Sequence, residues 1–187
     1  MAEILVCDDD KDIVEAIEIY LAQEGHHILK AYDGEQAIRV LQNNPVDLLI
    51  IMLGTNDTKE RFGASAACIA LGLKRLAEKA QSVKDCWRGG KPNILLVTPQ
   101  NIGKEYEQTH VASTMGAGCA EKSRGLASEY KALAEVLGCE YLDANEAVLS
   151  GPNQIDYMHL TAEGHEQLAD ALERKVRSIF KDCISQD

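Results

Sequence analysis

Three groups of residues have side-chain types and spacings that suit chemistry. Asp156 and His159 stand three residues apart, in front of a segment with helical periodicity. Gly54 and Asn56 follow a continuous apolar run, and three consecutive acids, residues 8–10, follow another. Proton transfer is commonly carried out by a histidine beside a carboxylate, and hard cations prefer clustered carboxylate oxygens. Hydrolysis and metal binding are therefore the two chemistries to weigh.

The elements that must position these residues alternate between strands and helices. The run at residues 46–53 is continuous rather than alternating in polarity, as a parallel strand covered on both faces requires. A helix-free stretch at 100–118 is long for a connection, which favours a binding or oligomer-forming loop. The alternation predicts an α/β domain with a parallel sheet. The expected strands are 3–7, 27–31, 46–53, 93–98 and 139–142, and the expected helices are 10–24, one starting near 34, 64–83, 121–137 and 161–181.

Composition limits the class of protein and its partners. The chain has 187 residues, 45% hydrophobic content and no apolar run near the roughly twenty needed to cross a bilayer, which predicts one soluble domain. A net charge of −11 disfavours nucleic acid and anionic membrane as partners. Six scattered cysteines without a CxxC pair argue against zinc and disulfides, so we expect no cofactor. The first residues carry no signal-peptide pattern, which favours a cytoplasmic location.

The first quarter of the chain, ILVCDDDKDIVEAIEIYLAQEGHHILKAYDGEQAIRVLQNNPVDLLII, resembles the start of a response-regulator receiver domain. The resemblance makes Asp8 and Asp9 the acidic pair that holds Mg²⁺ in that family. It also implies a phosphoacceptor aspartate after the third strand, where this chain has Met52. A thioether cannot accept a phosphoryl group, and residues 142–144 lack the lysine that receivers place after the fifth strand. We expect no phosphotransfer, and either a solvated acidic cluster or a weak Mg²⁺ site.

Later motifs belong to a different pattern. LGTND, the strand ILLVTP and DYMHLTAEGHEQLADAL resemble blocks of the SGNH, or GDSL-type, hydrolases, which cleave esters. In that family an Asp-x-x-His pair completes a triad with a serine, and an asparagine and a glycine donate to the oxyanion. The resemblance assigns the first pair of roles to Asp156 and His159. It assigns the oxyanion roles to Asn56 and, more weakly, to Gly34, whose Asp-Gly sequence is also typical of an ordinary turn.

The nucleophile of that triad is missing. Aligning ILVCDDD with the strand and GDS motif of the hydrolases places Asp10 at the position of the serine. The serines elsewhere in the chain fall on predicted helices, in the long loop or before the Asp-x-x-His turn. Any ester hydrolysis is therefore expected to be slow and to use a water molecule activated by His159.

Both resemblances imply the same architecture. The two families share a flavodoxin-like three-layer α/β/α sandwich with five parallel strands in the order 2-1-3-4-5, so a junction at the third strand is geometrically acceptable. We expect a single domain over 1–187, receiver-like over 1–50 and SGNH-like over 51–187. The first hypothesis is an engineered or chimeric scaffold with no intact parental activity and no partner beyond a second copy of itself. The alternatives are a residual SGNH-type esterase for small acyl esters and, less favoured, a signalling module that works without phosphorylation.

Overall fold

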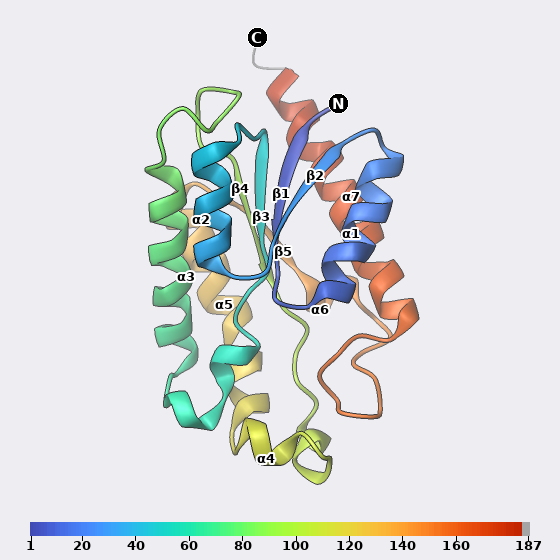
Figure 1. Cartoon of the computed structure of the whole chain (residues 1–187). Coiled ribbons are helices and arrows are strands. Elements are labelled where there is room, and N and C mark those ends of the chain that lie inside the picture. The colour runs from blue at the N-terminus through green and yellow to red at the C-terminus, as the bar shows by residue number, and fades with distance from the viewer. Residues whose placement is uncertain (185–187) are drawn as a thin grey trace.

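The computed structural model describes residues 1–184, with side chains described as far as residue 181, and it is a three-layer α/β/α sandwich (Figure 1). Five strands form one parallel sheet in the order β2-β1-β3-β4-β5, so the predicted fold class and strand order are confirmed. The strands are β1 (Glu3–Cys7), β2 (His27–Ala31), β3 (Leu48–Ile51), β4 (Ile94–Thr98) and β5 (Glu140–Asp143).

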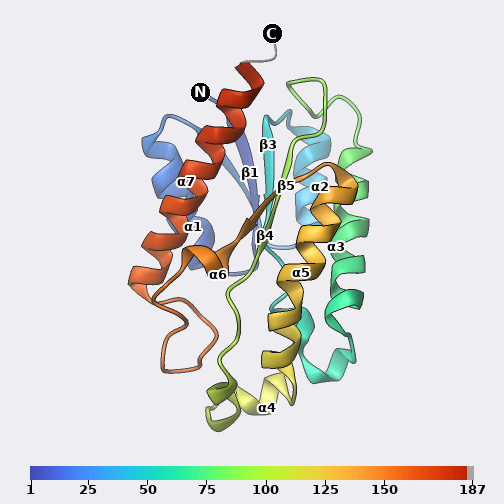
Figure 2. The same cartoon turned by 180° about the vertical axis from the view of Figure 1, so that it is seen from behind.

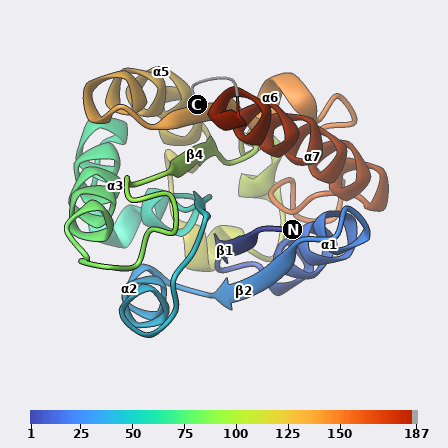
Figure 3. The same ribbon diagram turned by 90° about the horizontal axis from the view of Figure 1, so that it is seen from above.

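Helices cover both faces of the sheet, as the view down the sheet shows (Figure 3). One face is covered by α1 (Lys11–Gln23) and α7 (Ala162–Ile184), and the other by α2 (Gly34–Asn43), α3 (Ala66–Gln81) and α5 (Cys119–Leu137). Shorter helices lie at one end of the molecule and beside the sheet: α4 (Ala112–Met115), α6 (Ala144–Ala147), and the 3-10 turns η1 (Asn56–Thr58), η2 (Glu60–Phe62) and η3 (Lys104–Gln108). In the described part of the chain, no helix has both the length and the apolar character to span a bilayer.

The central strand β3 explains why the sequence pattern predicts a parallel sheet. All four of its side chains are fully buried. Leu49 and Ile51 pack into the core under α2, α3 and α5, whereas Leu48 and Ile50 pack into the core under α1 and α7. Burying each such side chain stabilises the fold by about 1.5–3 kcal/mol. Because β3 pairs with both β1 and β4, the receiver-like segment 1–50 and the SGNH-like segment 51–187 contribute strands to one sheet.

Polar residues after the strands start the helices. The Asp10 carboxylate accepts a hydrogen bond from the backbone N–H of Asp12 at 2.9 Å and caps α1. The Asp33 carboxylate caps α2 in the same way through the N–H of Gln36 at 2.7 Å. Each cap satisfies a backbone donor that has no partner within its own helix. The acids that follow the first strand are therefore partly structural.

The stretch at 100–118 differs from the expected open loop. It contains η3 and α4, which fold around Tyr106, a side chain with no exposed surface. The Tyr106 hydroxyl donates to the carbonyl of Gly116 at 2.6 Å and accepts from the N–H of Cys119 at 3.1 Å. The segment has its own small core, and its expected role in binding or oligomer formation stays a prediction. The residues of that core are Ile102, Tyr106, Met115, Cys119 and Ala120.

Candidate active site

A cavity of about 250 Å³ lies where β1, β3 and β4 end, beside the loop that precedes α7. Figure 2 shows this end of the sheet from the side of β5 and α7. The cavity brings the three acids after β1 together with Asn56, which follows β3, and with His159, which precedes α7. Its lining residues are Asp8, Asp9, Asp10, Ile13, Met52, Thr55, Asn56, Lys59, Pro99, Gln100, Val111, Thr114, Met115, Ala144, Met158, His159, Leu160 and Leu168.

Asp156 and His159 form a hydrogen-bonded pair. The Nδ1 atom of His159 lies 2.7 Å from Oδ2 of Asp156, and the other carboxylate oxygen accepts the backbone N–H groups of Met158 and His159 at 2.9 and 3.0 Å. Burial acts to raise the pKa of Asp156, but the hydrogen bonds from His159 and the two backbone donors outweigh it and lower that pKa. The carboxylate is thus charged, and it orients the ring by its Nδ1 edge. In the described residues, Nε2 has no hydrogen-bond partner and His159 lines the cavity.

A tight turn fixes this pair. The side-chain oxygen of Asn153 accepts from the N–H groups of Ile155 and Asp156 at 2.8 and 3.1 Å, and its amide nitrogen donates to the His159 carbonyl at 3.0 Å. Tyr157 takes a left-handed φ of 59° at the tip of the turn. One asparagine therefore joins both ends of the segment and sets the direction in which the imidazole points.

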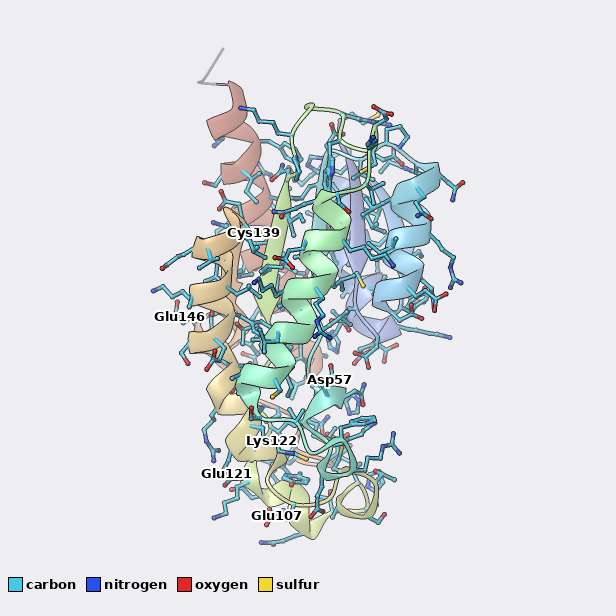
Figure 4. The ribbon with its side chains drawn as sticks, turned by 90° about the vertical axis from the view of Figure 1, so that its left-hand side faces the viewer. Asp57, Glu107, Glu121, Lys122, Cys139 and Glu146 are labelled. Atoms are coloured by element: carbon cyan, nitrogen blue, oxygen red, sulfur yellow. The ribbon has the colours of Figure 1, made fainter. Side chains whose placement is uncertain are left out.

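Asn56 lies in η1 across the cavity, after the Gly54 turn. Its amide nitrogen donates to the Asp9 carboxylate, so this bond joins the receiver-like acids to the hydrolase-like asparagine. The loop behind it is held by Lys122 of α5, whose ammonium group donates to the Thr58 carbonyl at 2.9 Å. Figure 4 labels Asp57 and Lys122 in this region, at the end of α3 and α5. The carboxamide therefore directs one N–H to Asp9, while Lys122 holds the backbone that follows it.

The three consecutive acids have different surroundings. Asp8 is only 4% exposed, and one of its oxygens accepts the Asp10 N–H at 2.7 Å. Desolvation, helped by the charges of Asp9 and Asp10, raises the pKa of Asp8 well above its ordinary value. Asp10 is half-buried and lines the cavity while its carboxylate caps α1. The candidate nucleophile position thus faces the same cavity as His159, and a carboxylate occupies it.

We expect the Asp8→Asn variant to be more stable than the parent at neutral pH. The raised pKa means that the folded state binds the proton more tightly than the unfolded state, so ionisation destabilises the parent as the pH rises above the ordinary value of 3.8. Asparagine keeps the acceptor for the Asp10 N–H and carries no charge. Urea unfolding should therefore give a higher midpoint for the variant at pH 7, and the difference should shrink as the pH falls toward 3.8. A lower midpoint at pH 7 would contradict the burial argument.

The acidic pair does not complete a magnesium cage. Met52, in the position where the receiver resemblance implies the phosphoacceptor aspartate, is 4% exposed and lines the cavity with a thioether that hard cations do not favour. Among the residues that the structure describes, no group of three or more His, Cys, Asp or Glu side chains is arranged to hold a metal ion. These residues do not fit Mg²⁺ well, and weak binding at Asp8 and Asp9 remains only an expectation.

Gly34 is not brought to the cavity that holds His159. It is the first residue of α2 and lines a second cavity of about 290 Å³. A Cβ added at this position would lie 2.9 Å from the Leu76 side chain of α3, so the backbone packs closely there. The oxyanion role that the resemblance assigns to it has no support in this placement. Motif comparison also misses four polar side chains that line the first cavity: Thr55, Lys59, Gln100 and Thr114. Thr55 and Lys59 lie in turns without periodicity and Thr114 in the short helix α4, so only the position of Gln100 just after β4 could have indicated it.

The serines that the sequence offers are absent from this lining, where the hydroxyl groups belong to threonines. The profile of the GDSL-like Lipase/Acylhydrolase family matches residues 13–167. The chain belongs to this family. The match contains Asn56, Asp156 and His159, and it begins three positions after Asp10, the position at which the family's serine is expected.

Solved structures described as esterases resemble this chain in fold. Est24, a carbohydrate acetylesterase from Sinorhizobium meliloti, is 26% identical with a TM-score of 0.73 over 96% of this chain and 100% of that one. A protein described as a putative arylesterase from Agrobacterium tumefaciens is 25% identical with a TM-score of 0.74 over the same shares. The aryl esterase of M. smegmatis, 23% identical with a TM-score of 0.76, shares the fold over 96% of this chain and all of its own.

Curated relatives of a second kind match a short part of this GDSL-family chain. The response regulator GtcR from Aneurinibacillus migulanus is 46% identical over 48 residues, which are 26% of this chain and 20% of GtcR. The transcriptional regulatory protein CpxR from Escherichia coli is 37% identical over 51 residues, or 27% and 22% of the two chains. The chain thus spans about a fifth of the length of the curated relatives it matches.

Proposed function

We propose that this GDSL-family chain hydrolyses small carboxylic esters with Asp156, His159 and Asn56, without a nucleophilic serine. The observation that carries the proposal is the 2.7 Å contact between Asp156 and His159, which leaves Nε2 available at a cavity that Asn56 also lines. A histidine oriented in this way is suited to take a proton from water. The family membership and the esterase likeness support the same class of reaction.

Each residue has one role in the proposed reaction. His159 accepts a proton from a water molecule through Nε2 as the water oxygen attacks the ester carbonyl. The charge that develops on the carbonyl oxygen is stabilised by an N–H of the Asn56 amide, and the charge on the imidazolium by Asp156. When the tetrahedral intermediate collapses, His159 returns the proton to the leaving alkoxide, which departs as an alcohol beside the carboxylic acid.

The size of the cavity favours small acyl groups. A volume of about 250 Å³, shared with the attacking water, leaves little room for a long acyl chain. Apolar side chains form part of the wall: Met52 just after β3, Ala144 of α6, Leu160 just before α7 and Leu168 of α7. The description of Est24 as an acetylesterase supports short acyl groups as the first substrates to test.

A second candidate function is a chimeric scaffold without activity. It is favoured by one observation, the 46% identity to GtcR over 48 residues, together with the carboxylate of Asp10 at the nucleophile position. On this hypothesis residues 1–50 derive from a receiver and residues 51–187 from a hydrolase. The two candidates differ in a single measurable property, namely whether His159 accelerates ester hydrolysis.

The deciding experiment compares the parent with its His159→Ala variant in hydrolysis of p-nitrophenyl acetate. We expect the variant to lose about 100-fold in kcat/KM, the lower end of what a general base contributes. The control is His165→Ala, on α7 and outside the cavity lining, which should keep the parental rate. Equal rates for the parent and His159→Ala would mean that His159 does not accelerate hydrolysis, and would favour the chimeric scaffold without activity.

Mass spectrometry during turnover separates water attack from attack by a threonine. Thr55 and Thr114 line the cavity, and nucleophilic catalysis by either would leave an acetyl group on the protein. We expect the intact mass to stay unchanged while substrate is consumed. An acetyl adduct that disappears in Thr55→Val or Thr114→Val would replace the water in the mechanism by that hydroxyl.

A further inference from the structure

We propose that the preferred substrates of this site are small esters that carry a protonated amine. The inference rests on the proposed esterase function and names the class of its substrate. It follows from three features of the same cavity: the excess of carboxyl groups, a buried amide oxygen without a hydrogen-bond partner, and an apolar wall small enough for a compact organic cation.

The cavity lining carries more acids than bases. Asp8, Asp9 and Asp10 line it together, and Lys59 and His159 are the basic residues that face them. His159 is already paired with the carboxylate of Asp156. Lys59 offsets one of the two charges of Asp9 and Asp10, so the field inside the cavity is negative even with a proton on Asp8, and it favours a cation over an anion. The −11 net charge of the whole chain acts in the same direction.

Gln100 supplies the second feature, because it lines the cavity and its Oε1 is buried without a hydrogen-bond partner among the described residues. A buried acceptor oxygen without a donor is unfavourable. Asp8 lines the same cavity, and its carboxyl group accepts the Asp10 N–H at 2.7 Å. A ligand that brings N–H groups and a positive charge would satisfy the kind of acceptor that this cavity holds.

The apolar wall supplies the third feature. Side chains of α1, α4, α6 and α7 and of the loops between them face the acids across the cavity, among them Ile13, Met115, Leu160 and Leu168. Such a wall accepts the methylene or methyl groups of a small amine but offers nothing to a second charge. Together with a volume of about 250 Å³, it limits the ligand to a compact ester.

Matched pairs of substrates test the charge directly. 2-(Dimethylamino)ethyl acetate and 3-methylbutyl acetate have nearly the same shape, and only the first is charged when protonated. Glycine methyl ester and methyl propionate form a second pair, with the amine on the acyl side. At pH about 6.5, below the range of about 7.7–8.0 in which α-amino groups titrate, the amines carry their protons. We expect at least about a tenfold higher kcat/KM for the cationic member of one or both pairs.

Variants of the acids show whether the cavity causes that preference. Asp10→Asn and Asp9→Asn each remove one acid from the lining, and the first keeps a helix cap. Each should reduce the preference for the cation by about threefold or more. The matched control is Asp12→Asn, on the same turn of α1 but outside the cavity lining, which should keep the parental ratio.

Binding to the His159→Ala protein separates this inference from the proposed function. Calorimetry or NMR titration with the two acetate esters measures Kd without turnover. A tighter Kd for the cation, by about tenfold, supports the inference even where the parent shows no hydrolysis. Equal affinities for the two acetate esters, or tighter binding of the neutral one, would overturn it even where the parent is an active esterase.

Discussion

The Asp10→Ser variant should hydrolyse p-nitrophenyl acetate at least about 100-fold faster than the parent. The substitution restores a hydroxyl at the position that the family's GDS motif gives to its nucleophile, on the cavity that His159 lines. A serine beside a histidine that a carboxylate orients divides the reaction into acylation and deacylation, each with a lower barrier than direct attack by water. A factor of 100 corresponds to about 2.7 kcal/mol in the activation free energy.

The structure also indicates that the substitution is compatible with the fold. Asp10 is the N-cap of α1, and serine is among the residues that cap helices well. The substitution removes a carboxylate that would repel the negative charge of a tetrahedral intermediate. The helix start is therefore retained while two obstacles to catalysis are removed together.

The measurement needs two controls. Asp10→Asn keeps the cap and removes the charge without adding a nucleophile, so it should stay far below Asp10→Ser. The double variant Asp10→Ser with His159→Ala should lose the gain, because the hydroxyl is no longer activated. Labelling by a fluorophosphonate should increase the mass of Asp10→Ser alone. A rate equal to that of Asp10→Asn would show that the alignment of ILVCDDD with the GDS motif is wrong.

Much of the fold follows from the sequence because burial leaves a direct pattern. The continuous apolar runs of β3 and β4 predict strands covered on both faces, and every side chain of these two strands is buried. The Asp156 and His159 pair could be predicted because three residues of separation are enough for a local turn to join them. Such features depend on neighbours in the chain, so they can be read from one sequence.

The remaining features depend on contacts between distant segments. The burial of Tyr106 turns an expected loop into a small folded unit, and no periodicity in residues 100–118 signals it. Gly34 lies at the start of α2, where the helix packs against Leu76 of α3, and this tertiary contact sets it apart from the cavity. Asp8 is buried and Asp9 is exposed, because the ends of neighbouring strands cover only the first of them. Three identical residues in a row give no sign of this difference in burial.

Gly54→Ala is expected to be among the most destabilising single substitutions outside the main core, at about 3 kcal/mol. Gly54 has φ of +134°, which costs a residue with a side chain on the order of 1–3 kcal/mol. An added Cβ would also overlap the Tyr130 hydroxyl oxygen and approach Tyr130 Cζ at 3.4 Å. Tyr130 has no exposed surface and donates to the Leu53 carbonyl at 2.8 Å, so it has little freedom to move away.

A double-mutant cycle separates the clash from the backbone strain. Tyr130→Phe alone should cost about 1 kcal/mol, because the Leu53 carbonyl loses its donor. In the Tyr130→Phe background, Gly54→Ala should cost about 1–2 kcal/mol less than in the parent, since the overlapping oxygen is gone. The matched control is Gly72→Ala on α3, where an added Cβ meets no atom within 4 Å and alanine should stabilise the helix by about 0.5–1 kcal/mol.

Urea unfolding gives the free energy of unfolding for the four proteins of the cycle, namely the parent, Gly54→Ala, Tyr130→Phe and the double variant. The rate of ester hydrolysis by the folded protein is a second measurement. Gly54 lies two residues before Asn56, so a shift that relieves the clash also moves the carboxamide proposed to stabilise the oxyanion. Hydrolysis should therefore fall in Gly54→Ala and partly recover with Tyr130→Phe. Additive free energies would mean that Tyr130 yields to the new methyl group, and that the glycine of LGTND is required for its backbone conformation alone. Coupled free energies would mean that a glycine is required at position 54 because Tyr130 leaves no room for a side chain. Tyr130 lies on α5, seventy-six residues further along the chain, and closes the core behind the candidate site.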